Sequence, residues 1–344
     1  MDLFEDIGLS GKQHKNFVNI LKQSMKADRA ELLKWCNGFP DRDNKLVTEF
    51  QTTFNSSFWE IYLYALFKEI DFKMDWSYSR PDFLLEYKGN NVVVEATISE
   101  SAVGKTPEWE KDLSKGIPDR FKDMNMDSII RLSNSINKKY IKYKSSYSKL
   151  EHVRPNPFVL AVAPFEQPHF NLQCEVPIMA LLYDFYVDED AYNDAPHLFP
   201  NGPPDVRLGW VEKDNGTEIP LGLFESDDYS EISAIILSTT ATWGKIEAMS
   251  GNCEIQRAVS SVWWSEVDNK PIQRHSMTNQ NKENVRDGLY VFHNPYAKKP
   301  IDPDMFKLDG VTQVFVDSDT KRITKERNGF CLMHRQTINF VSES

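Results

Sequence analysis

The chain has few cysteines, and their spacing does not indicate a shared metal site. The four cysteines lie far apart in the 344 residues and form neither a C-x-x-C pair nor a Cys/His cluster: they are Cys36, Cys174, Cys253 and Cys331. Structural zinc sites need closely spaced pairs of such ligands. The sequence therefore argues against a zinc site, and we expect reduced thiols in the core or at the surface.

Long apolar runs are also missing. A membrane-spanning helix needs about 20 consecutive apolar residues, and stretches such as Ile61–Phe67 and Phe158–Pro164 are far shorter. The first residues, MDLFEDIGLSGKQHK, carry acids early and have no apolar core of the kind found in a secretory signal. We therefore expect a cytoplasmic protein without a membrane span.

Positive charge is scarce over the whole chain. The sequence has 40 Lys and Arg against 51 Asp and Glu, which gives a net charge of −11. Such a balance argues against a protein that coats nucleic acid through its overall charge, so any anionic partner must meet a local basic patch. With 40% hydrophobic residues and no low-complexity tract, the chain is expected to fold around a substantial core.

The first part of the chain has a helical pattern. Residues 1–56 predict a helical region broken by Gly38, Pro40 and a DRDN stretch, with helices over Lys12–Gln23, Ala27–Asn37 and Asn44–Phe54. A more apolar helix is predicted over Ser57–Ile70, with Asn55 or Ser56 as its N-cap. Because this helix is apolar almost all round, we expect it to be buried.

A hairpin, a long helix and a strand are predicted next. Three strand-like runs cover Phe72–Trp76, Asp82–Tyr87 and Asn91–Ile98, and the turn KGNN joins the last two. A polar stretch (Ser99–Asp127) leads to a helix over Ser128–Leu150 and to the apolar strand FVLAVAPF.

The remainder, residues 166–344, is predicted to extend the same sheet. We expect a helix over Val176–Tyr186, a loop over Asp188–Asp214, and strands at Ser233–Thr239, Leu289–His293, Val311–Val316 and Gly329–Met333. The element order predicts an α/β fold, an α+β mixed sheet with helices packed on it. We divide it into an N-terminal helical region (1–56), a core (57–165) and a C-terminal region that extends the core (166–344).

Two acidic residues meet in the predicted hairpin. Pairing Tyr87 with Val92 across KGNN places Asp82 opposite Thr97, and Asp82, Glu95 and Thr97 then share one face. Two carboxylates at such a place repel each other unless a cation or a proton lies between them, and oxygen ligands suit Mg²⁺ or Mn²⁺. The residues leave an alternative open, in which Asp82 caps a strand and Glu95 pairs with a buried Lys or Arg.

This arrangement resembles that of a known superfamily. Arg80-Pro81-Asp82 heads one strand, Glu-x-Thr follows in the next, and a buried helix carrying Glu60 precedes both. Over about a third of the chain, Ser57–Phe165, this pattern resembles the PD-(D/E)xK nucleases and their restriction-endonuclease-like fold. The resemblance implies that Asp82, Glu95 and the main-chain carbonyl of Ala96 bind Mg²⁺ or Mn²⁺, and that Glu60 is an additional acid.

The sequence departs from the superfamily pattern at Thr97, where a lysine is usual. Some members carry the lysine function on the following helix, and the segment INKKYIKYKSSY offers Lys138, Lys139, Lys142 and Lys144. We favour Lys139 as the catalytic lysine, because Ser135, Lys139 and Tyr143 lie four apart on one helical face. Two alternatives remain: these lysines form a solvated face, or the site has lost its chemistry.

The same segment is the local basic patch. Residues 128–154 hold seven basic residues against the single acid Glu151, a net charge of +6 that leaves −17 for the rest of the chain. We expect nucleic acid to bind here, at Lys138, Lys142, Tyr143 and Lys144. His152 and His293 have no nearby nucleophile in sequence, and we expect both to be structural.

The sequence thus predicts a metal-dependent endonuclease that hydrolyses phosphodiester bonds in DNA. By the same resemblance, its setting would be bacterial restriction or anti-phage defence. The alternative is a non-catalytic nucleic-acid-binding or assembly protein with a degenerate nuclease fold. RNA as the substrate, a homo-oligomer and a protein partner all remain open.

Overall fold

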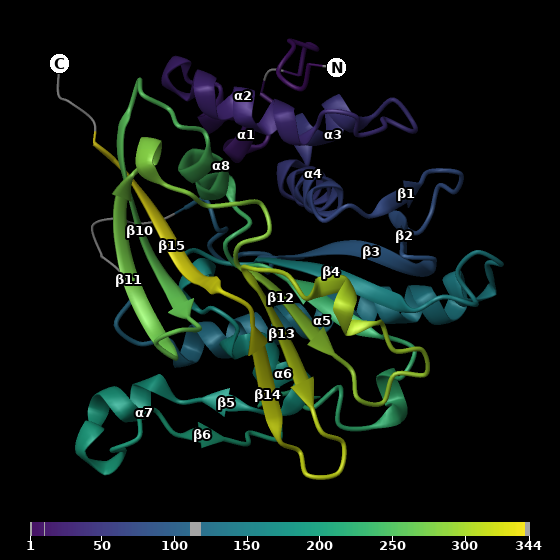
Figure 1. The fold of residues 1–344 in the computed structure, drawn as a ribbon, viewed down its shortest axis with the longest axis vertical. Coiled ribbons are helices and arrows are strands. Elements are labelled where there is room, and N and C mark those ends of the chain that lie inside the picture. The colour runs from purple at the N-terminus through teal and green to yellow at the C-terminus, as the bar shows by residue number, and fades with distance from the viewer. Residues whose placement is uncertain (1, 10, 111–117, 341–344) are drawn as a thin grey trace.

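An eight-stranded mixed sheet runs through the protein in the computed structural model, which describes residues 2–9, 11–110 and 118–340 (Figure 1). Its strands, in spatial order, are β1 (Lys73–Asp75), β2 (Phe83–Tyr87), β3 (Asn90–Glu100), β4 (Phe158–Phe165), β9 (Ala234–Leu237), β12 (Leu289–His293), β13 (Val311–Val316) and β14 (Ile323–Arg327). The pairs β3/β4, β4/β9 and β12/β13 are parallel, and the other neighbours are antiparallel. The predicted mixed α/β sheet is confirmed.

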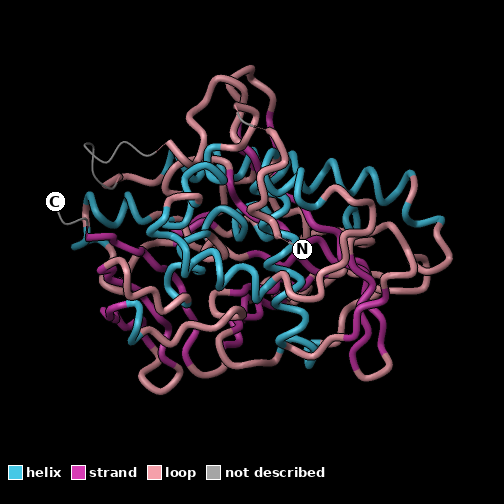
Figure 2. The backbone as a smooth tube through the Cα atoms, turned by 90° about the horizontal axis from the view of Figure 1, so that it is seen from above, coloured by secondary structure: helices cyan, strands magenta, loops and turns pink. Residues whose placement is uncertain are grey.

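Helices cover both faces of this sheet (Figure 1). On one face, α4 (Phe54–Glu69) packs on Val92 and Val94 of β3. On the other face, α5 (Lys122–Ser145) and α6 (Val176–Tyr183) pack on Val93. The alternation of side chains along a strand therefore divides the core into two layers. Seen from above, the longest helix, α5 with 24 residues, runs along one border of the molecule (Figure 2).

The N-terminal helical region packs beside α4. It consists of α1 (Lys15–Ile20), the 3₁₀ turn η1 (Gln23–Met25), α2 (Lys26–Trp35) and α3 (Leu46–Thr52). Its rings continue the core of α4, since Phe50 lies 5.0 Å from Phe54 between ring centroids. The helices predicted here all exist and are shorter than expected. The helix α4 starts at Phe54 after Thr53, so the predicted cap at Asn55 or Ser56 is wrong.

A separate three-stranded sheet holds the end of the described chain. In it, β10 (Gln256–Ser265) lies between β11 (Lys270–Met277) and β15 (Phe330–Phe340). The prediction that all later strands extend the main sheet is therefore wrong for β15. The strands β9, β12 and β13 do extend the main sheet as predicted.

Smaller elements complete the fold. The segment predicted as a loop over Asp188–Asp214 contains a short helix and short strands as well as irregular structure. The remaining elements are β5 (Tyr186–Val187), α7 (Glu189–Asp194), β6 (Asp205–Val206), β7 (Trp210–Glu212), β8 (Glu218–Pro220), α8 (Trp243–Met249) and the 3₁₀ turns η3 (Tyr147–Lys149), η4 (Phe170–Leu172), η5 (Pro196–Leu198), η6 (Asp227–Tyr229), η7 (Thr278–Gln280) and η8 (Pro303–Phe306). Residues 111–117 of the predicted polar stretch lie outside the described residues. Within the described ranges, the structure contains no helix long and apolar enough to cross a membrane.

A buried ion pair ties the second sheet to the N-terminal region. The guanidinium of Arg257, on β10, donates to Asp28 Oδ1 at 3.0 Å and to Asp28 Oδ2 at 3.2 Å, and both side chains have no exposed surface. Arg257 also donates to Asn339 Oδ1 on β15 at 2.6 Å. One side chain thus links α2, β10 and β15.

We predict that Arg257→Met destabilises the protein, because it leaves the carboxylate of Asp28 buried without its cation. Loss of one partner of a buried pair costs about 3–5 kcal/mol, and urea unfolding of the full chain measures it. The matched control is Lys270→Met at an exposed position of β11, which should change the free energy of unfolding by less than about 0.5 kcal/mol. Equal effects of the two substitutions would contradict a linking role for Arg257.

Candidate functional site

The hairpin of β2 and β3 brings Asp82, which directly precedes β2, close to Glu95 on β3. Phe83 pairs with Val94 and Tyr87 with Asn90. The turn is therefore the two-residue Lys88-Gly89, with positive φ at both positions, as in a type I′ turn. Continued by one residue, this register puts Asp82 opposite Glu95.

The pairing of Tyr87 with Val92 expected from the sequence is thus wrong by two residues. A shift of two does not change the face on which a side chain lies, because side chains alternate with a period of two. The register agrees with a common face of Asp82 and Glu95, but Asp82 lies in the bend before β2 and outside the observed pairing, so the common face stays a prediction.

Glu95 is a buried acid whose two oxygens differ. Its Oε1 accepts hydrogen bonds from Lys139 Nζ at 2.6 Å, Lys142 Nζ at 3.0 Å and the Tyr147 hydroxyl at 3.1 Å. Its Oε2 is buried and has no hydrogen-bond partner among the described residues. Only 1% of the Glu95 side chain is exposed. One oxygen is thus held by three donors, and the other has none among the described residues.

Asp82 lies half-buried just before β2, next to the backbone of β3. Its Oδ2 accepts a hydrogen bond from the Ala96 amide at 2.7 Å. Burial, followed by the negative charge of Glu95, raises the pKa of Asp82 to about 6, and the charge of Lys139 opposes this shift. The amide and carbonyl of one strand residue point to the same edge, so the Ala96 carbonyl lies on the Asp82 side of β3.

Glu60 approaches the same acids from α4. Burial, followed by the negative charge of Asp82, raises the pKa of Glu60 to about 8. The positive charge of Lys139 lowers the pKa of Glu60, so Glu60 interacts both with an acid and with the lysine of the site. The residues Glu60, Asp82, Glu95 and Lys139 therefore form one electrostatic unit.

The arrangement can accept a hard cation through few protein ligands. Within residues 2–9, 11–110 and 118–340, no three His, Cys, Asp or Glu side chains are grouped closely enough to hold a metal ion. Mg²⁺ commonly binds through one or two carboxylates and completes its shell with water and phosphate oxygens. The unpartnered Oε2 of Glu95 fits such a role, with the Asp82 carboxyl as a second ligand.

The residues expected to contact nucleic acid have separate environments. Lys138 and Lys144 are exposed on α5. Lys142 is half-exposed but already bound to Glu95. Tyr143 is 2% exposed, with its ring 4.3 Å from that of Phe158. The prediction that Tyr143 binds nucleic acid is therefore wrong, since this ring packs in the core and has no free face.

Several residues at the site carried no local signal in the sequence. Tyr147 follows α5 and contacts Glu95 only because the chain turns back there. The loop before Asp82 is held by Arg42, which donates to the Tyr78 carbonyl at 2.8 Å, and by His152, whose Nε2 lies 2.9 Å from the Arg80 carbonyl. His152 also stacks on Tyr78 with ring centroids 3.7 Å apart. His152 thus has a structural role, as predicted.

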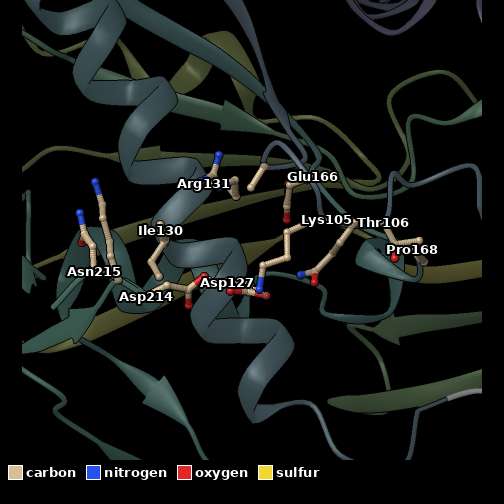
Figure 3. Close-up of a pocket in the computed structure, with 12 residues that line it drawn as sticks. Lys105, Thr106, Asp127, Ile130, Arg131, Glu166, Pro168, Asp214 and Asn215 are labelled. Carbon is tan, nitrogen blue, oxygen red and sulfur yellow. Dashed lines mark ion pairs between the residues drawn. The ribbon is translucent and has the colours of Figure 1, made fainter. Parts of the chain in front are cut away.

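A separate cavity of about 340 Å³ opens beside the first half of α5 (Figure 3). It contains Arg131, which precedes Lys139 by eight residues and therefore lies about 12 Å away along the helix axis. Figure 3 shows the Lys105 side chain reaching toward Asp127, and its Nζ lies 3.9 Å from Asp127 and 3.7 Å from Asp214. Cations and carboxylates are mixed in this cavity, so its charge selects neither an anion nor a cation.

We predict that Glu60→Gln stabilises the protein increasingly as the pH rises. The folded protein holds the Glu60 proton up to a pKa of about 8, whereas the unfolded chain releases it near the ordinary value of 4.5. The parent therefore loses stability as the pH rises from about 4.5 through 8, and the glutamine variant does not have this loss. Urea unfolding at pH 5, 7 and 9 measures the difference.

The control for this prediction is Glu151→Gln, at an exposed position. Its effect on the free energy of unfolding should be nearly the same at the three pH values. If the difference between Glu60→Gln and the parent is also constant, Glu60 does not lie in the environment described above.

Comparisons of this chain with protein-family models, with curated proteins and with solved structures gave no match. The function must therefore be argued from the geometry and chemistry of the Asp82–Glu95 site.

Proposed function

We propose that this protein is a metal-dependent endonuclease of the PD-(D/E)xK type that hydrolyses phosphodiester bonds in DNA. The observation that carries the proposal is that the Asp82 carboxylate, bound to the Ala96 amide, lies next to Glu95, with Lys139 Nζ 2.6 Å from Glu95 Oε1. Two acids and a lysine at one point of a sheet are the groups that this reaction needs.

The acids would hold the metal ion. Glu95 Oε2, the Asp82 carboxylate and the Ala96 carbonyl would bind Mg²⁺ or Mn²⁺, with Glu60 as an additional acid nearby. Bound there, the ion would polarise the phosphate and lower the pKa of a coordinated water. Because the pKa of Asp82 is raised to about 6 by burial and by Glu95, a divalent cation would also replace the proton that Asp82 can hold.

Lys139 would act as the catalytic lysine, because position 97, where the superfamily usually has this lysine, is Thr97 in this chain. The side chain of Lys139 is 19% exposed and ends at Glu95, two residues before Thr97. Its ammonium can face the negative charge that develops on the phosphate and can orient the attacking water. Lys142, with 48% of its side chain exposed, is placed farther out. We assign it to a phosphate of the substrate.

Exposed cations lie on the helix and on the loop that carry the site residues. Lys138 and Lys144 lie on α5, and Arg154 follows it. Arg80 belongs to the loop that leads to Asp82, and Arg42 donates to the Tyr78 carbonyl of this loop. The strongly negative remainder of the chain repels a polyanion, so these cations would direct DNA to the site. The Tyr143 ring has no part in this surface.

The setting follows only from the resemblance to the nuclease superfamily. It favours DNA over RNA and a role in bacterial restriction or anti-phage defence, in the cytoplasm. Whether the protein acts as a homo-oligomer or with a protein partner is not part of the proposal.

One observation favours a second candidate, a non-catalytic nucleic-acid-binding protein. Lys139 and Lys142 both contact Glu95, so this acid has cationic partners without a metal ion. With Thr97 at the motif position, the same residues would then be a structural ion-pair cluster beneath a nucleic-acid-binding helix. Metal binding separates the two candidates.

We predict that metal binding and cleavage can be separated by two substitutions. Glu95→Gln should abolish Mn²⁺ binding, measured by calorimetry, and with it the cleavage of DNA. Lys139→Ala should retain Mn²⁺ binding and lower the cleavage rate by about 10²-fold, the usual effect of losing one aimed electrostatic group. Thr97→Lys in the Lys139→Ala background should recover part of the rate.

The matched control is Lys138→Ala, the exposed neighbour of Lys139, which should cleave at nearly the parent rate. A parent protein that binds no Mn²⁺ and cleaves neither DNA nor RNA would contradict the nuclease proposal and favour the second candidate. Parent-like cleavage by Lys139→Ala would remove only the role given to this lysine.

We also predict that the exposed lysines of α5 determine the salt dependence of DNA binding. Replacing Lys138 and Lys144 with Glu should weaken binding and lower the slope of log K against log salt by about one unit for each lost phosphate contact. Lys270→Glu on the distant strand β11 is the matched control. Equal slopes for the parent and the double variant would place the DNA-binding surface elsewhere.

A further inference from the structure

A cavity of about 750 Å³ lies on the α4 side of the protein, where the N-terminal region meets the second sheet. Its walls come from α1, the start of α4, the end of β4 with η4, the start of α8 and strand β15. The volume is within the range of pockets that bind small organic ligands, about 300–1,000 Å³. The proposed nuclease chemistry makes no use of this cavity.

Aromatic rings from separate segments line the cavity. They include Phe54 and Phe58 on α4, Phe165 at the end of β4, Phe170 on η4, Trp109 and Trp243. The rings of Phe54 and Trp243 lie 6.5 Å apart, and Phe165 and Phe170 meet edge to face at 5.4 Å. Rings at several angles around one space suit a flat ligand with a π face.

Polar groups at the wall have fixed directions. The side-chain amides of Asn16 and Asn55 both donate to Glu108 Oε1 at 2.8 Å, and Asn16 also donates to Asn55 Oδ1 at 3.0 Å. Only 8% of Glu108 is exposed. These contacts hold two amides and a carboxylate as a preformed polar edge beside the aromatic rings.

One polar group of the wall lacks a partner. The indole nitrogen of Trp243 is buried and has no hydrogen-bond acceptor among the described residues. An unpaired buried N–H costs about 1–3 kcal/mol. Because this nitrogen has no exposed surface, it does not face the cavity, and Trp243 contributes to the wall through the exposed part of its side chain.

We propose that this cavity binds the nucleobase of a nucleotide. A nucleobase offers a π face to the rings and amino or imino donors to the Asn16–Asn55–Glu108 edge. Lys22, exposed at the rim, is placed to meet a phosphate. The site shares no residue with Asp82, Glu95 or Lys139, and it is independent of the proposed nuclease function.

The test measures the binding of the four nucleoside 5′-monophosphates to the full-length protein by calorimetry. We expect at least one to bind with a dissociation constant below about 1 mM, and ribose 5-phosphate to bind at least about tenfold more weakly, because it lacks the base. Trp243→Ala should weaken the binding about fivefold, since it removes a ring that lines the cavity. Glu95→Gln should bind like the parent.

Two adjacent positions on α1 give a matched pair of variants. Asn19 lines the cavity, whereas Val18 is exposed and does not. Asn19→Trp should fill the entrance and weaken binding at least tenfold, and Val18→Trp should leave it unchanged. Ile338→Trp blocks the cavity from β15, so a folding defect in one variant does not remove the test.

A short single-stranded oligonucleotide serves as the second probe. Binding of the oligonucleotide alone, with the same loss in Asn19→Trp, would support the site and assign it to a base within a strand. The proposal is overturned if neither probe binds, if ribose 5-phosphate binds as well as the nucleotides, or if Asn19→Trp and Ile338→Trp both bind like the parent.

Discussion

The buried carboxylate of Glu95 is the constraint on which the candidate site depends. A carboxylate with 1% exposure in the middle of a sheet requires positive charge and hydrogen-bond donors around it. The long helix α5 and the turn after it supply them through Lys139, Lys142 and Tyr147. The position of α5 across β3 is thus tied to this acid as well as to the packing of its apolar side.

Parts of this arrangement can be predicted from the sequence because they obey local rules. The alternation of side chains along a strand predicts one face for Asp82 and Glu95 in either of two registers that differ by two residues. The prediction of a common face therefore does not depend on the turn length. The interruption of VVVEATI by Glu95 marks it as a buried acid that needs a partner. The four-residue spacing of the helix also selects Lys139 as a residue that can reach it.

Other parts depend on contacts between distant segments and leave no local pattern. Tyr143 lies four residues after Lys139 and by spacing shares its helix face. Its ring nevertheless packs on Phe158, because the position of α5 on the sheet places the ring there. Strand β10 buries Arg257 and Ser261 among its inward side chains, so its alternation of apolar and polar residues is weak. The partners that bury these polar groups, such as Asp28, come from about 230 residues away.

Three buried acids show how the same electrostatic problem is solved differently. Both oxygens of Asp28 accept hydrogen bonds from Arg257, which also contacts Glu247, and Ser250 and Asn252 donate to Asp28 as well. Burial raises the pKa of Glu166 to about 7, so this acid can keep a proton near neutral pH. Glu95 instead gathers three donors on Oε1 and leaves Oε2 without one. The neighbouring Asp82 adds a second acid to the environment of Glu95, and one or two carboxylates are the ligands that Mg²⁺ commonly uses. The oxygen without a donor therefore distinguishes Glu95 from Asp28, whose two oxygens are both bound, and it is the reason to place the proposed chemistry at Glu95.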